Sequence, residues 1–309
     1  MTTPVFYMFE ASQWRAHVQN CWETLLQHHK ITADSNCGTH VHVSKRQQFG
    51  LGPLKRIAQC IIHFEPAIEA IVPPSRRGNQ FARSNWLEGE KFALKRISRT
   101  QAIELIGLMQ QREDVRKSMC PRKNGKYAAW SFAAMKQLET IEFRKPPAST
   151  TAAECLKWAE FATTFIIAAL EIGDDADTIG YLDDIPPNVG GLKNFLLGRG
   201  SCHQRQSPRF HEPHLLDPLW QDIPHGEDAH IEPTITWGLG QDTVKCESHI
   251  VRTMARKDQE RYDKLLDIAK QGQPVKWLRG HPCKPVPEID LGKEPSRWSG
   301  HSPTSTINK

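Results

Sequence analysis

The chain has 309 residues, 39% of them hydrophobic, and a formal net charge of +5 at neutral pH. This length allows one large domain or two, and the apolar fraction is sufficient for a buried core. The positive excess is too small to argue for binding to nucleic acid.

Signals for export, membrane insertion and disulfide formation are weak. The first residues lack a basic segment followed by a long apolar run, which argues against a signal peptide. The most apolar helical stretch, residues 161–172, contains Thr163, Thr164 and Glu171 and is too short and polar to span a bilayer. The cysteines form no Cys-x-x-Cys pair, which favours free thiols. We therefore expect a cytoplasmic protein with no membrane or nucleic-acid partner.

Helical periodicity is clear in the first third of the chain. Ser12 can cap a helix that runs to about residue 29. A second helix is predicted from Leu54 to about residue 72, kinked at Pro66 and ended by a Pro-Pro pair. Thr100 can cap a third helix that runs to about residue 112.

Between the first two helices lies a stretch, residues 36–44, that alternates polar and apolar side chains. This alternation over β-branched residues predicts a half-buried strand, with His40 and His42 on one face and valines on the other. Two imidazoles at this spacing lie roughly 6–7 Å apart at Cα, so both can reach one metal ion or one phosphate group. Gly38, just before them, indicates a bulge or a close backbone approach.

Residues 140–144 have the same alternating form, after a further extended stretch at residues 127–132. Thr140, Glu142 and Arg144 fall on one face of this predicted strand. If the two strands pair with their apolar faces on a common core, His40 and His42 share a surface with Glu142 and Arg144. Such a surface offers nitrogen ligands, a hard oxygen ligand and a bidentate phosphate clamp, which suits a metal-bound nucleotide.

The composition changes in the second half of the chain. Thr151 and Glu154 form a capping-box pattern that opens a helix with an apolar stripe. Glycines near residues 198–200 suggest a domain boundary, which gives a first domain over residues 1–198 that contains both predicted strands. Residues 199–309 are predicted to form a poorly ordered extension with one charged helix near residues 247–271.

Several polar residues have simpler interpretations. Arg76, Arg77 and Arg83, considered alone, predict a solvated basic loop. Cys37 is most simply a small buried residue, and His63 a satisfied core or boundary residue. A zinc site is an alternative for the C-terminal histidines and cysteines, whose spacing matches no known finger: Cys202, His203, His211, His214, His225, His230, Cys246 and His249.

Three motifs together resemble the amidoligase family in its fungal form. They are Cys37-Gly38-Thr39-His40-Val41-His42-Val43, Arg77-Gly78-Asn79 and Thr140-Ile141-Glu142-Phe143-Arg144-Lys145-Pro146-Pro147. The similarity covers roughly residues 10–197. It implies an α+β fold in which an antiparallel catalytic sheet carries helices on one face, as in glutamine synthetase and glutamate–cysteine ligases.

The resemblance also implies an activity. Family members are ligases that use Mg²⁺ and ATP to convert a carboxylate to an acyl phosphate, which an amine attacks to give an amide. The partners would be a small-molecule or peptide carboxylate and an amine donor. By this resemblance, Glu142 would bind Mg²⁺ and Arg144 the transferring phosphate. His40 and His42 would contact the metal or phosphate, and Arg77 and Asn79 the nucleotide or substrate.

One feature of the family is missing from this sequence. Family members begin with a strand carrying two alternating glutamates, and no Glu-x-Glu stretch lies upstream of His40. We therefore expect an N-terminally truncated or degenerate ligase with weakened metal affinity. Two other functions stay open. His40, His42 and Glu142 could bind zinc or iron in a His₂–carboxylate enzyme. Alternatively, the protein could be a non-catalytic interaction protein derived from the ligase fold.

Overall fold

The structure is a computed structural model. It describes residues 2–7, 13–34, 36–89, 92, 97–121, 125–173, 178–198, 213–221 and 223–233. The expected cap Ser12 and the helix expected near residues 247–271 lie outside the described residues.

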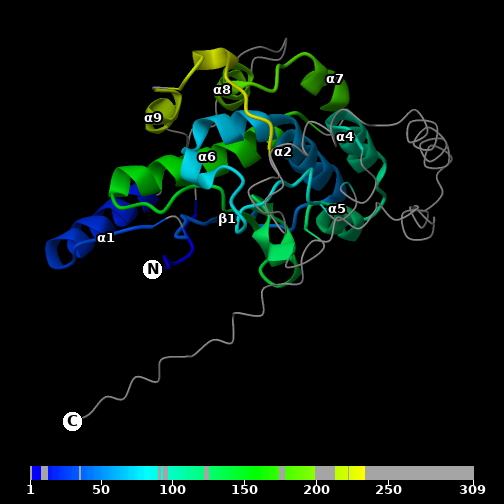
Figure 1. The fold of residues 1–309 in the computed structure, drawn as a ribbon. Coiled ribbons are helices and arrows are strands. Elements are labelled where there is room, and N and C mark those ends of the chain that lie inside the picture. The colour runs from blue at the N-terminus through cyan, green and yellow to red at the C-terminus, as the bar shows by residue number, and fades with distance from the viewer. Residues whose placement is uncertain are drawn as a thin grey trace, which may run out of the picture.

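Helix α2 (Leu51–Ile71) runs through the centre of the fold, and most of its residues are buried (Figure 1). It contacts α4 (Arg99–Leu108), α6 (Ala152–Leu170) and α8 (Val189–Leu197). The run Ile57–Ile62, apolar except for Gln59, explains this position, since a helix that is apolar on several sides is stable only when other elements surround it.

The helix boundaries differ in detail from those predicted. Helix α2 is a single element that continues past Pro66. The helix expected over residues 100–112 is α4, which ends at Leu108, and a separate helix, α5 (Arg112–Ser118), follows it. Ser98, not Thr100, caps α4, because Ser98 and Gln101 form a reciprocal capping box.

The sheet has three antiparallel strands in the order β1 (Val41–Val43), β3 (Ile141–Phe143), β2 (Trp130–Ser131). In the β1–β3 pair, His42 lies directly opposite Glu142. The apolar face of the sheet packs on α6 through rings that include Phe143 and Phe161, whose centroids are 5.3 Å apart. The predicted pairing of these two strands and the α+β class are therefore confirmed.

Helix α1 (Trp14–His28) is an outer layer on α6, where Trp14, Val18 and Trp22 pack in a small cluster with Leu156. The capping residue predicted for α6 is confirmed, because the Thr151 side chain accepts from the Glu154 backbone N–H. Glu154 itself accepts from Thr150, one residue earlier than a complete capping box requires.

The remaining described elements are short helices and turns. They are α7 (Thr178–Asp183), α9 (Asp217–Trp220) and the 3₁₀ turns η1 (Pro74–Arg76), η2 (Gly125–Tyr127), η3 (Ala133–Lys136), η4 (Pro213–Leu216) and η5 (Gly226–Asp228). Leu216 and Leu219 belong to the main hydrophobic core. No described helix is both long enough and apolar enough to cross a membrane.

Candidate functional site

Three side chains, from β1 and from the residues next to β1 and β3, meet at one carboxylate oxygen, Oε1 of Glu142 on β3. Arg144 Nη1 lies 2.6 Å from it, His40 Nδ1 3.1 Å and His42 Nε2 3.5 Å. We call this group of His40, His42, Glu142 and Arg144 the strand cluster. Its members lie together as the alternating patterns predicted, whereas their chemical roles stay predictions.

The electrostatics of the strand cluster keep Glu142 ionised. Burial raises the pKa of Glu142, but hydrogen bonds from His40 and His42 and the charge of Arg144 outweigh it and hold the pKa far below its ordinary value. The Glu142 side chain is only 9% exposed, whereas those of His40 and His42 are 37% and 40% exposed. The Glu142 carboxylate is therefore shielded by one largely buried guanidinium and by two imidazoles that face solvent.

Arg144 is held in place from behind. Its Nε donates to the carbonyl oxygen of Phe81 at 3.2 Å. Its guanidinium carbon lies 5.8 Å from the centre of the Tyr127 ring, which packs edge-on against Phe81. These contacts restrict the stem of the side chain and leave the outer nitrogens for Glu142. Thr140 supports the other side of the cluster, since its hydroxyl lies 2.9 Å from His42 Nδ1.

Arg76 ties the two strand segments together below the cluster. Its guanidinium donates to the carbonyl oxygens of Cys37, Arg144 and Lys145. The prediction of a solvated basic loop is wrong here, because Arg76 and Arg83 are 2% and 3% exposed. These arginines are buried because their guanidinium groups donate hydrogen bonds to backbone carbonyl oxygens.

The loop before β1 contains two residues for which the sequence made predictions, Gly38 and Cys37. The predicted close approach at Gly38 is confirmed, since a Cβ there would lie 3.0 Å from Arg76 Nη2 and 3.2 Å from the Pro146 carbonyl oxygen. Cys37 is exposed, not buried as expected, and its carbonyl oxygen accepts from Arg76. The described cysteines, Cys21, Cys37, Cys60, Cys120 and Cys155, are free thiols.

The other two predicted site residues bind elsewhere. Arg77 donates to the carbonyl oxygens of Glu69 and Ala70, where it satisfies the C-terminal end of α2. Asn79 accepts a hydrogen bond from the Phe81 N–H at 2.9 Å and so shapes the turn whose carbonyl holds Arg144. The structure does not bring either side chain to Glu142, and their roles toward nucleotide or substrate stay predictions.

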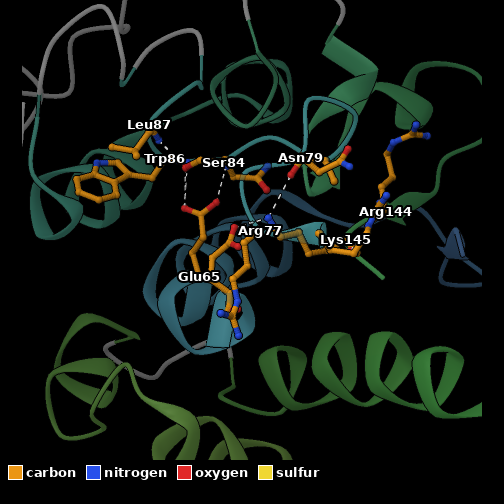
Figure 2. Close-up of polar contacts among 12 residues, drawn as sticks. Glu65, Arg77, Asn79, Ser84, Trp86, Leu87, Arg144 and Lys145 are labelled. Atoms are coloured by element: carbon orange, nitrogen blue, oxygen red, sulfur yellow. Dashed lines mark hydrogen bonds and ion pairs between the residues drawn. The ribbon is translucent and has the colours of Figure 1, made fainter. Parts of the chain in front are cut away.

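A layer of buried charge lies behind the strand cluster, and the sequence patterns did not reveal it. Figure 2 shows that Arg144 and Lys145 extend to opposite sides of the chain. Lys145 is 1% exposed and pairs with Glu69 of α2. One turn earlier in α2, Glu65 accepts from the Ser84 hydroxyl at 3.0 Å and the Asn85 N–H at 2.7 Å. The signal in the sequence was a pair of carboxylates four residues apart in the mostly apolar second half of α2.

Two carboxyl groups of this layer have strongly shifted pKa values. Burial raises the pKa of Glu65 to about 7, although the Asn85 N–H works against that shift. Burial likewise raises the pKa of Glu88 to about 7 against the opposing charge of Arg83. The Lys145–Glu69 pair and the bonds of Glu65 to Ser84 and Asn85 connect α2 to the segments that hold Arg144.

His63 matches its predicted role as a satisfied core residue. Its Nε2 lies 2.8 Å from the Ile185 carbonyl oxygen, and burial lowers its pKa to about 4. The zinc alternative cannot be placed, since Cys202, His203, His211, Cys246 and His249 lie outside the described residues.

The donor set of the strand cluster bears on the Mg²⁺ that the resemblance implies. Across the described ranges, no group of three or more His, Cys, Asp or Glu side chains is arranged to hold a metal ion. Glu142 is the one hard oxygen ligand, and Arg144 already contacts its Oε1. Mg²⁺ commonly takes one or two protein carboxylates together with substrate phosphates and water. The residues therefore fit nucleotide-bound Mg²⁺ better than the free ion.

Comparison with known proteins gives one result. Residues 1–166 match the family described as "putative amidoligase enzyme", and this match spans more than half of the chain. No curated protein and no solved structure matches the chain. The matched residues contain every member of the strand cluster, and the chain belongs to this amidoligase family.

Proposed function

We propose that the protein is an ATP-dependent carboxylate–amine ligase whose phosphoryl-transfer site is the strand cluster. The observation that carries this proposal is the convergence of Arg144, His40 and His42 on Glu142 Oε1, at 2.6, 3.1 and 3.5 Å. Family membership supports the ligase class. A guanidinium and two imidazoles beside one ionised carboxylate suit a group that carries both phosphate and metal.

The proposed reaction has two steps. A carboxylate oxygen of the first substrate attacks the γ-phosphorus of ATP, ADP leaves, and an acyl phosphate forms. The amine nitrogen then attacks the acyl carbon, inorganic phosphate leaves, and the nitrogen loses a proton as the amide forms. Both steps place negative charge on phosphoryl oxygens, which fixed positive groups stabilise.

Each member of the cluster has a role in this scheme. Arg144, with its stem fixed by Phe81 and Tyr127, holds the transferring phosphoryl group. His40 and His42 donate to phosphoryl oxygens from the solvent-facing side. Glu142 would hold Mg²⁺, which when bound spreads positive charge over the phosphate oxygens.

The His₂–carboxylate alternative for zinc or iron has less support. Its three ligands do lie together, but the Arg144 guanidinium is the group nearest to the oxygen that the metal would use. A zinc or iron site of this kind is built from protein ligands, and across the described residues no three His, Cys, Asp or Glu side chains are arranged to hold a metal ion. Arg144 is useful in a phosphate site and unfavourable in a hydrolytic zinc site.

Trapping of the acyl phosphate tests the proposed function. The purified protein is incubated with Mg²⁺, ATP, a panel of small and peptide carboxylates, and hydroxylamine as the amine. We expect carboxylate-dependent release of ADP together with a matching amount of hydroxamate, and loss of both in Arg144→Ala. Arg116→Ala is the matched control, since it removes a surface arginine paired with Glu113 outside the cluster. ADP release that needs no carboxylate, or equal rates in Arg144→Ala, would contradict the proposal.

A further inference from the structure

The closest contact in the strand cluster is between two groups that the proposed reaction needs separately. Arg144 Nη1 lies 2.6 Å from Glu142 Oε1, where the phosphate clamp and the metal ligand neutralise each other. Both side chains are largely buried, with 11% and 9% of their surface exposed. An ion pair shielded from water in this way is screened little by solvent.

We propose that Arg144 guards Glu142, so that the metal and the nucleotide phosphate bind only together. This inference rests on the proposed function and concerns how its site is loaded. In the free protein, Arg144 excludes a divalent cation from Glu142. An arriving phosphate draws the guanidinium away and exposes the carboxylate to the metal.

Movement of Arg144 away from Glu142 is a turn of the whole guanidinium. The group is planar and rigid, so Nη1 cannot leave Glu142 while Nε keeps its hydrogen bond to the Phe81 carbonyl. The turn gives up both contacts, so a polyanionic phosphate has to replace both. His40 and His42 lie on the exposed side of the same oxygen and can contact the phosphate without crossing the protein.

Binding of the metal and binding of the phosphate are thermodynamically coupled through the Arg144–Glu142 pair. Breaking the Arg144–Glu142 pair costs free energy that is spent once, whether metal, phosphate or both bind. Each ligand must therefore raise the affinity for the other by the same factor. Coupling between sites commonly amounts to about 5–150-fold, so an effect of at least about tenfold is expected here.

The test measures binding of Mn²⁺, a spectroscopic substitute for Mg²⁺, by electron paramagnetic resonance, and does not depend on turnover. In the wild type, Mn²⁺ alone should remain free up to millimolar concentration. With a non-hydrolysable ATP analogue, one Mn²⁺ should be retained per protein in equilibrium dialysis. Stoichiometric Mn²⁺ binding by the nucleotide-free wild type would contradict the guard.

The variants separate the guard from a general loss of binding. Arg144→Gln should bind Mn²⁺ without nucleotide at least about tenfold more tightly than the wild type, while its affinity for the analogue falls. Adding Glu142→Gln should abolish this gain. Arg116→Gln, which breaks the Arg116–Glu113 pair on α5, should leave Mn²⁺ binding at the cluster unchanged.

The outcomes also distinguish this inference from the proposed function. If the wild type binds the analogue but Arg144→Gln shows no gain for Mn²⁺, the guard is wrong and the ligase proposal stands. If no form of the protein binds the analogue, the proposed function and the coupling to nucleotide both fail, and a gain of Mn²⁺ affinity in Arg144→Gln shows only that Arg144 excludes a cation from Glu142. Stoichiometric Mn²⁺ binding by the nucleotide-free wild type would overturn the guard even where a variant does not fold.

Discussion

At the scale of single residues, the central feature is a carboxylate that accepts from three nitrogen groups. Glu142 keeps its charge because His40, His42 and Arg144 more than offset the cost of burial. The alternation of polar and apolar side chains along two short strands was sufficient to predict that these residues share a face. It could not predict that Arg144 turns toward Glu142, since a side-chain rotamer depends on contacts such as those with Phe81 and Tyr127.

The low pKa of Glu142 predicts an acid dependence of stability. The unfolded carboxylate titrates near 4.5 and the folded one at lower pH. The group's stabilisation is therefore complete above the unfolded pKa and is lost as pH falls toward the folded pKa. Urea unfolding from about pH 6 to about pH 3 should show a steeper loss in the wild type than in Glu142→Gln. Parallel curves for the two proteins would mean that the ion pairs do not stabilise the fold.

At the scale of elements, buried charge connects α2 to the segments around the strand cluster. Glu69 binds Lys145, which follows Arg144, and Glu65 fixes the turn at Ser84 and Asn85. The helices and strands were largely predictable from periodicity. This buried layer was not, because Arg76 and Lys145 carry charge and only the tertiary structure shows that backbone carbonyls and carboxylates enclose them.

The Glu69–Lys145 pair gives a stability prediction. Lys145→Met leaves the Glu69 carboxylate buried without its cation, which should cost about 3–5 kcal/mol of unfolding free energy. Replacing Glu69 with leucine in the same protein removes the uncompensated charge and should recover most of that loss. Chemical denaturation measures both changes. A double variant as unstable as the single one would show that packing, not charge, dominates at this site.

Glu65 predicts a pH dependence opposite in sign to that of Glu142. Burial raises its pKa from 4.5 to about 7, so the folded state holds the proton more tightly than the unfolded state. Its contribution to stability is complete below the unfolded pKa and is lost as pH rises through the folded pKa of about 7. Thermal unfolding between those two values should therefore depend less on pH in Glu65→Gln than in the wild type. An unchanged slope would contradict the raised pKa.

At the scale of the whole molecule, the core extends beyond the residues that match the family. Leu216 and Leu219 belong to the same hydrophobic cluster as α2 and α6, although the family match ends at residue 166. Their irregular, Pro- and His-rich surroundings gave no periodic signal, so the sequence did not reveal this packing. The domain boundary predicted near residue 198 stays a prediction, which concerns whether residues 1–198 fold independently.

A single substitution tests whether this segment stabilises the core. Leu216 is fully buried, so Leu216→Ala should lower the unfolding free energy by about 2–5 kcal/mol. Leu26→Ala is the matched control, because Leu26 is 48% exposed and its loss should have little effect. Urea denaturation of the full chain measures both. Equal stability of the two variants would indicate that residues 213–221 add nothing to the core.

The most direct test of the central claim is a calorimetric titration of Mg-ATP into the purified wild type, Arg144→Ala and Arg116→Ala. A bidentate guanidinium cannot be replaced by isolated point charges. We therefore predict saturable binding by the wild type and Arg116→Ala, and none by a folded Arg144→Ala. Equal affinity in all three proteins would show that the strand cluster does not bind the nucleotide phosphates.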